Sequence, residues 1–207
     1  MKLYYAVGTC SMAIHILLEE IGEPYEKHCL RFATDDQKQP AYLAVNPKGK
    51  VPALQTDQHG VLTEMPAIAF YLAKMFPKAG LLPEDTMAQV RALETMEYVA
   101  ATVHMRGFSR LSRPANFSAD GDPELVRREG LNVIETGLRI LDAQLGKRDY
   151  FLGDYSIVDA VVYIVEHWAG VRGVELPANL RAHHQRLLAR PAVQRMLEAE
   201  KQAAAAA

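Results

Sequence analysis

Apolar and polar residues are patterned differently in the two parts of the chain, and the change comes near residue 80. Up to Phe76, short apolar runs alternate with amphipathic stretches, as in a mixed α/β domain. The strands are predicted near 2–5, 25–30, 52–56 and 60–63, and the helices near 11–22, 40–45 and 64–76. Beyond residue 80 the apolar spacing is helical almost throughout. Helices are predicted over 86–108, 124–146, 156–169, 180–190 and 192–203, with a loop over 114–123.

The segment Pro77–Pro83 separates the two patterns, because its Pro and Gly residues interrupt regular structure. We therefore predict a mixed domain over 1–79, a linker over 80–86 and an all-helical domain over 87–207. Within the helical domain, the helix over 156–169 is apolar on all sides, which indicates the buried centre of a bundle. Ser156 stands three residues before Asp159, a spacing that predicts a capping box at the start of this helix.

Composition and charge exclude several classes of function. A net charge of −2 provides no basic surface for nucleic acid or anionic lipid. No apolar run approaches the ~20 residues needed to span a bilayer, and no signal peptide is recognisable at the start. Two cysteines, Cys10 and Cys29, are too few for a disulfide framework. We expect a cytoplasmic protein with reduced thiols and no membrane or nucleic-acid partner, in which Cys29 is a core residue.

Cys10 carries the clearest chemical signal. It follows the loop Ala6–Thr9 and precedes a helix predicted from Ser11 to Ile21. Unpaired N–H groups and the helix dipole at such an N-terminus favour the thiolate, so we expect the pKa of Cys10 to fall from about 8.5 toward neutrality. The alternative is a buried structural cysteine. Ala13 stands where a Cys-x-x-Cys motif has its second cysteine, so thiol exchange at Cys10 requires an external thiol.

Two further segments have features of a site for a small peptide. If the bond between Val51 and Pro52 is cis, the backbone of Val51 is free to pair with an extended peptide; an ordinary trans proline opening an edge strand is the alternative. Thr63 is predicted to cap a helix that has Pro66 in its first turn. The N–H groups there suit a carboxylate and Glu64 suits an ammonium group, unless Glu64 only complements the helix dipole.

Five segments, in order, resemble the glutathione transferase family, and the first resembles its bacterial beta class. The segments are Tyr5 with Gly8–Ser11, Asn46–Leu54 followed by Thr63–Leu72, Gly153–Ala160, and Arg190–Val193. The resemblance covers essentially the whole chain. It implies an α/β thioredoxin-like N-terminal domain followed by an all-α C-terminal domain that holds a pocket for an electrophile.

The resemblance also implies the activity and the site. The expected reaction is conjugation of the glutathione thiolate to small hydrophobic electrophiles. Cys10 would lie near the glutathione sulfur, Val51 would pair with the cysteinyl backbone ahead of a cis Pro52, and Glu64 with the Met65 N–H would hold the γ-glutamyl end. Glutathione is then a co-substrate, no tightly bound cofactor or metal is expected, and the protein is expected to be a homodimer.

Some positions depart from the family pattern. The beta class has a His immediately before a basic-Gly-Phe triplet, whereas here Met105 precedes Arg106 and His104 lies one residue earlier. One residue is about 100° on a regular helix, so His104 is either a catalytic group or a packed or solvent-facing side chain. Met65 replaces a small or hydroxylated residue, which leaves only its backbone N–H as a donor. Tyr98 aligns with an Asn that the family uses from the neighbouring subunit.

Recognition of the glycyl end is the least defined part. The family's Lys at that end aligns near Thr34–Asp35, where Arg31 and Lys38 are the nearest cations. Further candidates for contact with the electrophile or the partner subunit are Tyr5, Tyr98, Thr102, Met105 and Arg106. The sequence does not indicate which electrophile is used.

Other histidines and arginines allow simpler interpretations. His15 is expected to be structural, and His183 and His184 point to different helix faces, which predicts a solvated pair rather than metal ligands. Arg106, Arg110 and Arg113 form either a solvated basic face or one that attracts an anionic substrate. Two other functions stay open: a glutathione-dependent thioltransferase or disulfide reductase acting through Cys10, and a non-catalytic glutathione-transferase-like binding protein.

Overall fold

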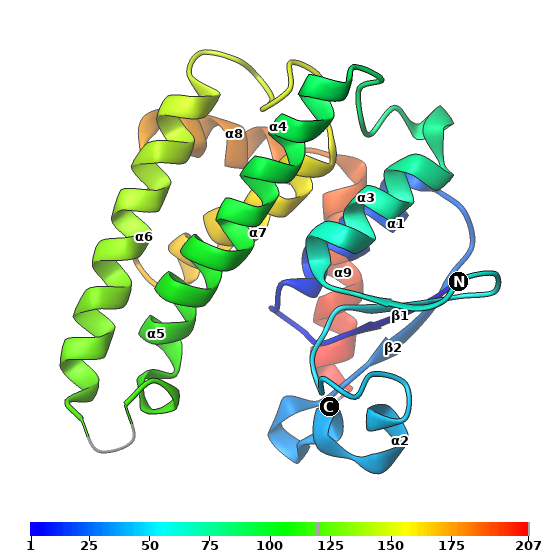
Figure 1. Ribbon diagram of the computed structural model, residues 1–207, viewed down its shortest axis with the longest axis horizontal. Helices are drawn as coiled ribbons and strands as arrows, with labels where there is room; N and C mark the ends of the chain where they lie inside the picture. Colours follow the sequence, from blue (N-terminus) through cyan, green and yellow to red (C-terminus); the bar gives the residue numbers. More distant parts are fainter. Residues whose placement is uncertain (119–120, 207) are drawn as a thin grey trace. The chain divides into compact units, whose positions relative to one another are not determined.

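A computed structural model describes residues 1–118 and 121–206 (Figure 1). The chain divides into two compact units, one formed by Met1–Leu82 together with the residues from Leu187 onward, the other by Pro83–Arg186. These units differ from the predicted domains 1–79 and 87–207 at the C-terminal end. Helix α9 (Pro191–Ala205) belongs to the first unit because it packs against α1 (Ser11–Ile21).

The first unit is built on a mixed four-stranded sheet with the order β2-β1-β3-β4. Its strands are β1 (Lys2–Tyr5), β2 (Glu26–Cys29), β3 (Ala53–Thr56) and β4 (Gly60–Thr63). β1 pairs in parallel with β2 and antiparallel with β3, so that Leu3 lies opposite both Lys27 and Leu54. α1 connects the two parallel strands, as a crossover helix must. This is the thioredoxin-like arrangement that the sequence predicts.

The helices of the first unit begin and end close to their predicted limits. α1 ends at Gly22, whose φ of 77° is the left-handed conformation that glycine adopts readily. α3 (Met65–Met75) packs against α1 and, with it, buries residues such as Leu17 and Ile68 completely. The short elements are α2 (Pro40–Leu43) and the 3₁₀ turns η1 (Phe32–Thr34), η2 (Asp36–Lys38) and η3 (Pro77–Ala79).

The second unit is helical. Its elements are α4 (Thr86–Glu97), η4 (Tyr98–Phe108), α5 (Ser109–Ser112), the 3₁₀ turn η5 (Pro114–Asn116), α6 (Pro123–Leu145), α7 (Ile157–Val171) and most of α8 (Ala178–Leu188). Part of the predicted loop over 114–123, residues 119–120, lies outside the described residues. No helix among the described residues is long and apolar enough to cross a membrane.

α7 is the buried helix that its apolar sequence predicts, since Ile157 through Glu166 are all buried. The predicted capping box is present at its start. Ser156 Oγ accepts a hydrogen bond from the Val158 N–H at 3.3 Å, and the Asp159 carboxylate accepts one from the Ser156 N–H at 2.8 Å. These contacts satisfy N–H groups that would otherwise be unpaired at the helix N-terminus.

The predicted helix over 86–108 is continuous, but its second half is π-helical. η4 covers Tyr98–Phe108, and three of its four buried residues, Val99, Val103 and Gly107, recur every four positions. Glycines let this segment approach α6 closely. A Cβ atom on Gly137 would lie 2.6 Å from Val103 Cγ2, and one on Gly107 would lie 2.8 Å from Ile134 Cγ1. The close packing fixes the face on which His104 and Arg106 are carried.

Candidate functional site

The thiol of Cys10 lies against the backbone of Val51. Cys10 is the N-cap residue of α1, and its half-buried thiol donates a hydrogen bond to the Val51 carbonyl oxygen at 3.4 Å. The bond between Val51 and Pro52 is cis, as the family resemblance implies. The fold therefore brings together two of the predicted site residues that are 41 positions apart in the chain.

The loop before Cys10 is held by hydrogen bonds to its own backbone. The Ala6 carbonyl oxygen accepts from Thr9 Oγ1 at 2.8 Å and from Ser11 Oγ at 3.1 Å. Gly8 donates its N–H to Glu200 Oε2 of α9 at 2.8 Å. The position of the thiol is consequently set by local turns and by one contact from the far end of the sequence.

The expected lowering of the Cys10 pKa is wrong for the free protein. Burial raises the pKa of the thiol from its ordinary value of 9.0 to about 12; a backbone hydrogen bond and the Lys50 ammonium act in the opposite direction, and the Glu64 carboxylate adds to the rise. The side chain is partly open to solvent, but packed protein surrounds most of the sulfur. The cost of desolvating a thiolate outweighs the stabilisation from the helix N-terminus.

At the start of α3, Glu64 rather than Thr63 is the N-cap residue. Thr63 ends β4, and Glu64 has the positive φ of 68° with ψ of 115°, so the prediction for Thr63 is wrong. Lys48 Nζ donates to Glu64 Oε1 at 2.6 Å and to Thr63 Oγ1 at 2.9 Å. Met65 is the first helical residue, with its side chain buried and Pro66 beside it in the first turn. Glu64 is thus exposed at the helix N-terminus with Lys48 balancing its charge.

Tyr5 is not brought to the surface. It is 4% exposed, and its ring lies edge-on to that of His15 at 5.4 Å between centroids. Burial raises the pKa of Tyr5 to about 12. This position argues against the predicted contact of Tyr5 with an electrophile or partner. Cys29 itself is half-buried on the edge strand β2, so it is not the core residue that we expect from the sequence.

The cations predicted near the glycyl end are already paired. Arg31 Nε lies 3.1 Å from Asp36 Oδ2, and Lys38 Nζ lies 3.0 Å from Asp35 Oδ1. His15 is fully buried, and burial lowers its pKa to about 4, which fits the structural role expected for it. Among the described residues, no group of three or more His, Cys, Asp or Glu residues is arranged to hold a metal ion.

The remaining predicted site residues lie in the helical unit, on η4. His104 is half-buried, with its ring 4.8 Å from that of Trp168 in an edge-on arrangement. Met105 is exposed, whereas Tyr98 and Thr102 are half-buried, and burial raises the pKa of Tyr98. The roles of these residues remain predictions.

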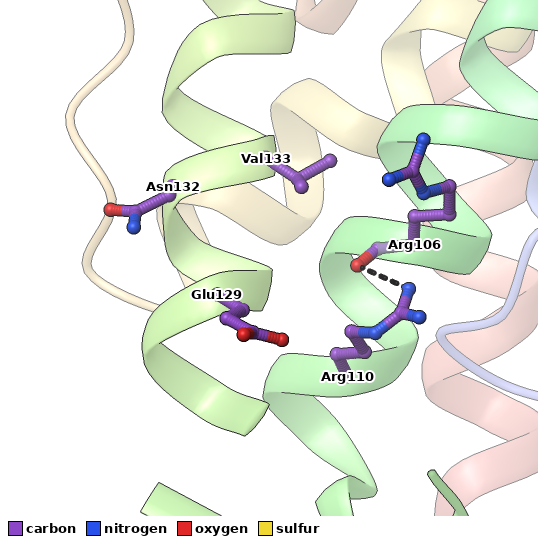
Figure 2. A pocket seen from close by; sticks show the side chains of 5 residues that line it. All are labelled: Arg106, Arg110, Glu129, Asn132 and Val133. Carbon is purple, nitrogen blue, oxygen red and sulfur yellow. Dashed lines mark hydrogen bonds between the residues drawn. The ribbon is translucent and has the colours of Figure 1, made fainter. Parts of the chain in front are cut away.

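A groove of about 350 Å³ runs between η4, α5 and α6 (Figure 2). It is lined by Arg106, Arg110, Glu129, Asn132 and Val133. Arg110 Nη1 donates to the Arg106 carbonyl oxygen at 3.1 Å. The predicted basic face therefore exists for two of its three arginines, but the carboxylate of Glu129 on the opposite wall offsets part of their charge.

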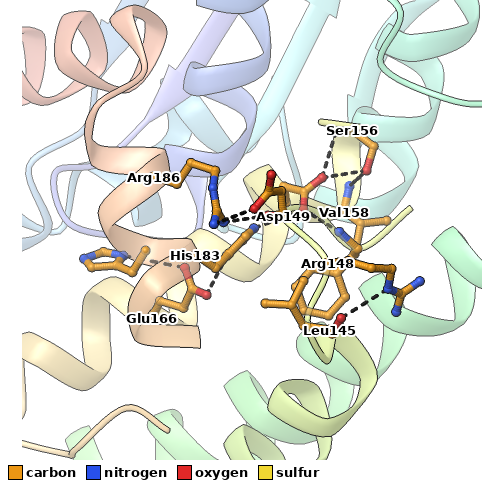
Figure 3. A network of polar contacts seen from close by, with 11 residues as sticks. Leu145, Arg148, Asp149, Ser156, Val158, Glu166, His183 and Arg186 are labelled. Atoms are coloured by element: carbon orange, nitrogen blue, oxygen red, sulfur yellow. Dashed lines mark hydrogen bonds and ion pairs between the residues drawn. The ribbon is translucent and has the colours of Figure 1, made fainter. Parts of the chain in front are cut away.

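His183 is part of a buried polar network rather than a solvated pair (Figure 3). Its Nδ1 lies 2.7 Å from Glu166 Oε1, and its Nε2 lies 3.0 Å from Asp159 Oδ1. Burial alone would lower the pKa of His183, but the two carboxylates raise it to about 9. Asp159 and Glu166 are two carboxylates seven residues apart on an otherwise apolar helix, and buried carboxylates require a cation beside them. This pair of acidic residues is therefore the sequence signal that indicates the network.

Comparisons with known proteins fit this geometry. The family description "Glutathione S-transferase, N-terminal domain" matches residues 8–75. The glutathione S-transferase GstA of Escherichia coli is 34% identical over 212 residues, covering 97% of this chain and 98% of that protein. Maleylacetoacetate isomerase of Pseudomonas aeruginosa is 32% identical, covering 86% and 85%. The structure of a sphingomonad glutathione S-transferase complexed with glutathione has a TM-score of 0.85 and 34% identity, covering 97% and 99%.

Proposed function

Because this chain belongs to the glutathione S-transferase family, we propose that it conjugates the glutathione thiolate to small hydrophobic electrophiles. The observation that carries the proposal is the contact between the Cys10 thiol and the Val51 carbonyl oxygen at 3.4 Å, beside the cis peptide bond to Pro52. Glutathione bound along this segment has its sulfur next to Cys10.

The surrounding groups support glutathione as the co-substrate. The backbone of Val51 can pair with an extended peptide. The N-terminus of α3, including the Met65 N–H, suits the α-carboxylate of the γ-glutamyl end, and Glu64 suits its ammonium group. Glu64 is close enough for its charge to raise the pKa of the Cys10 thiol. A related sphingomonad enzyme is complexed with glutathione.

In this reaction the thiol of glutathione loses its proton, its sulfur forms a bond to an electrophilic carbon, and the leaving group departs with the electron pair of the broken bond. Because its pKa is high, the Cys10 thiol stays protonated at neutral pH and is available as a hydrogen-bond donor. A protonated Cys10 donates a hydrogen bond to the bound thiolate and so stabilises the reactive form. We expect His104, which lies one position before the family's histidine position, to be a second participant.

A conjugation assay with a chlorinated nitrobenzene and glutathione tests the proposal. The wild type is expected to accelerate the reaction. Cys10→Ala is expected to lower kcat by about tenfold, the effect of losing one hydrogen bond to a charged group, and His104→Ala is expected to lower it as well. Cys29→Ser, which changes the other thiol, is the control that keeps activity. Conjugation by the wild type no faster than in buffer, over a panel of electrophiles, refutes the proposed reaction.

A thioltransferase activity is the second candidate, and a free thiol at a loop-to-helix junction favours it. The Cys10 thiolate would attack the glutathione sulfur of a mixed disulfide between glutathione and a substrate. This step would form a disulfide between Cys10 and glutathione and release the substrate thiol. A second glutathione would then reduce the mixed disulfide and leave oxidised glutathione. The raised pKa of Cys10 makes it a poor nucleophile, which ranks this activity below conjugation. Release of thiol from a glutathionylated peptide, abolished in Cys10→Ala, is the result that would reverse this order. A non-catalytic glutathione-transferase-like binding protein would fail both assays and would not be retained on a glutathione-affinity column.

A further inference from the structure

We propose that the groove between η4, α5 and α6 binds a small acidic amino acid, an α-amino dicarboxylate such as L-glutamate. Arg106 and Arg110 line one wall of this groove, and Glu129 lines the other (Figure 2). Its volume of about 350 Å³ is at the lower end of the range for small-molecule sites. The groove lies in the second unit, whereas the candidate glutathione-binding residues lie in the first, so its ligand does not depend on the proposed function.

Close packing beside the groove holds its two walls in place. A Cβ atom on Gly130 of α6 would lie 2.9 Å from a backbone carbonyl oxygen of η4, so the two helices are in contact there. Arg106 and Arg110 are four residues apart along η4 and α5. Glu129 and Val133 are four residues apart along α6. Because residues four apart share one face of a helix, each pair lines one wall.

The two arginines have guanidinium groups available for a ligand. Arg110 Nη1 donates to the Arg106 carbonyl oxygen at 3.1 Å, and Arg110 Cζ lies 4.8 Å from the centre of the Phe117 ring. These contacts orient the Arg110 side chain and leave further N–H groups for a carboxylate. Arg106 is exposed, and neither arginine forms an ion pair within the part of the chain that the structure describes.

Glu129 places a negative charge across the groove from the arginines. Its carboxylate points from α6 toward η4 and α5, on the same side as Val133, whereas Asn132 points away in this view (Figure 2). Although they line one groove, Glu129 forms no ion pair with either arginine or with any other cation among residues 1–118 and 121–206. The opposite charges are therefore separated by a space that a ligand bearing both signs can fill.

The charges of the lining determine the class of ligand. Two guanidinium groups and one carboxylate leave one net positive charge, so the complementary ligand has one net negative charge and carries both signs. An α-amino dicarboxylate has this composition. Its carboxylates pair with Arg106 and Arg110, its ammonium group pairs with Glu129, and its methylene groups contact Val133. A dicarboxylate without the ammonium group would bring negative charge against Glu129.

Calorimetric titration with three ligands tests the assignment: L-glutamate, glutarate, which lacks the ammonium group, and L-glutamine, which lacks the side-chain carboxylate. The wild type is expected to bind L-glutamate about two- to fivefold more tightly than either of the others, the range for one solvent-exposed ion pair. The variants are Glu129→Gln and Arg110→Gln. The matched controls are Glu135→Gln and Arg128→Gln, both exposed on α6 and outside the lining of the groove.

In Glu129→Gln, the preference for L-glutamate over glutarate is expected to disappear, because the partner of the ammonium group is gone. In Arg110→Gln, L-glutamate and glutarate are both expected to bind about two- to fivefold more weakly. Arg106→Gln, at an exposed position, should give the same loss without disturbing the fold. Both controls should behave as the wild type. A wild type that binds none of the ligands, or a preference that survives in Glu129→Gln, overturns the inference.

L-Glutamate also corresponds to the γ-glutamyl end of glutathione, so the start of α3 is the competing location. Glu64→Gln removes the carboxylate proposed there and is expected to leave L-glutamate binding unchanged. If L-glutamate binding is lost in Glu64→Gln and kept in Glu129→Gln, the ligand occupies the first unit. That result overturns the assignment to the groove while it supports the proposed function.

Discussion

Glu200 reaches from α9 to the loop before Cys10, where its Oε2 accepts the hydrogen bond from the Gly8 N–H at 2.8 Å. Its carboxyl group is 6% exposed, and its Oε1 has no hydrogen-bond partner among the described residues. Tyr5 and Cys29 are the titratable side chains on which its charge acts. Burial raises the pKa of Glu200 to about 7, although the Gly8 N–H works against the rise. The loop that carries the thiol is therefore held by a group that ionises near neutral pH.

Glu200→Gln is expected to stabilise the protein above pH 7. The folded-state pKa of about 7 lies above the ordinary 4.5, so the contribution of this carboxyl is fully present below pH 4.5 and is lost as the pH rises through 7. Glutamine keeps an acceptor for Gly8 without the charge. Urea unfolding should give a gain of up to about 3 kcal/mol at pH 8 and none at pH 4.5. Glu198→Gln, exposed on the same helix, is the control; a Glu200→Gln protein less stable than the wild type at pH 8 would contradict this account.

The Cys10 thiol is expected to react slowly at neutral pH in the free protein. Because its pKa is raised to about 12, the thiolate fraction grows about tenfold for each pH unit through the accessible range. The rate of alkylation by iodoacetamide, followed by mass spectrometry in a Cys29→Ser background, should rise steadily from pH 7 to pH 10. A rate that levels off near pH 7 would mean that the helix N-terminus, not burial, sets the acidity of this thiol.

For single residues, the sequence predicts where a side chain lies within a helix or loop better than it predicts the burial and the charges around that side chain. The location of Cys10 at a helix N-terminus follows from the residues around it. Its pKa does not, because the burial that raises it depends on tertiary packing, which brings the Val51 carbonyl oxygen, 41 positions away in the chain, to 3.4 Å from the sulfur. The side chain of Thr63 predicts a capping role for that residue, whereas the backbone gives the role to Glu64, whose φ of 68° is not indicated by any sequence pattern.

Among the elements, α7 and α8 are joined by the network around His183. Asp159 accepts hydrogen bonds from the Phe151 and Ser156 N–H groups in addition to its contact with His183, so one carboxylate ties a loop, a helix start and a neighbouring helix together. Glu166 and His183 are both fully buried. Removing the imidazole leaves two buried carboxylates without their cation.

His183→Gln is expected to destabilise the helical unit by about 3–5 kcal/mol near pH 6, the range for breaking a buried ion pair. The folded-state pKa of about 9 lies above the ordinary 6.5, so the contribution of His183 is complete below pH 6.5 and is lost as the pH rises through 9. Urea unfolding of the wild type and the variant at pH 6, 8 and 10 measures this difference.

The difference in the free energy of unfolding between the wild type and His183→Gln should decrease from pH 6 to pH 8 and again from pH 8 to pH 10. His184→Gln, which removes the adjacent half-buried imidazole, is the matched control and should cost less. A gap that stays constant from pH 6 to pH 10 would show that His183 contributes by packing rather than by charge.

The sequence also predicts the helices and strands of both units, because apolar residues recur along each element with the spacing that is typical of a helix or of a strand. The π-helical geometry of η4 is the exception. Three of its four buried residues, Val99, Val103 and Gly107, recur every four positions. This spacing is wider than the regular turn of 3.6 residues, but an ordinary helical pattern accommodates it without a visible break. The orientation of His104 could not be derived from the sequence for this reason.

For the whole molecule, the placement of α9 is what the sequence least reveals. The pattern predicts a helix there, but not that it packs on α1 of the first unit. Ion pairs 2.7 Å long join Arg190 to Glu20 and Arg195 to Glu19, across 170 and 176 positions of the chain. Contacts between such distant residues depend on tertiary packing, which local periodicity does not encode.

We expect the protein to be a homodimer, as its family implies. On α4 an apolar stripe is exposed, with Met87, Val90 and Leu93 at 58%, 45% and 40%. Burial of this stripe against a second copy would remove apolar surface from water. Sedimentation should therefore give a species of twice the chain mass, and Val90→Glu should shift it toward the monomer, with Glu94→Gln as a control on the same helix. A wild type that sediments only as a monomer would refute this expectation.

The most direct test of the central claim is a calorimetric titration of the wild type and Cys10→Ala with glutathione. The account predicts saturable binding at one site per chain in both proteins, because the backbone of Val51, the start of α3 and Glu64 hold the peptide while Cys10 acts on its sulfur. The absence of binding to the wild type at millimolar glutathione would contradict the account.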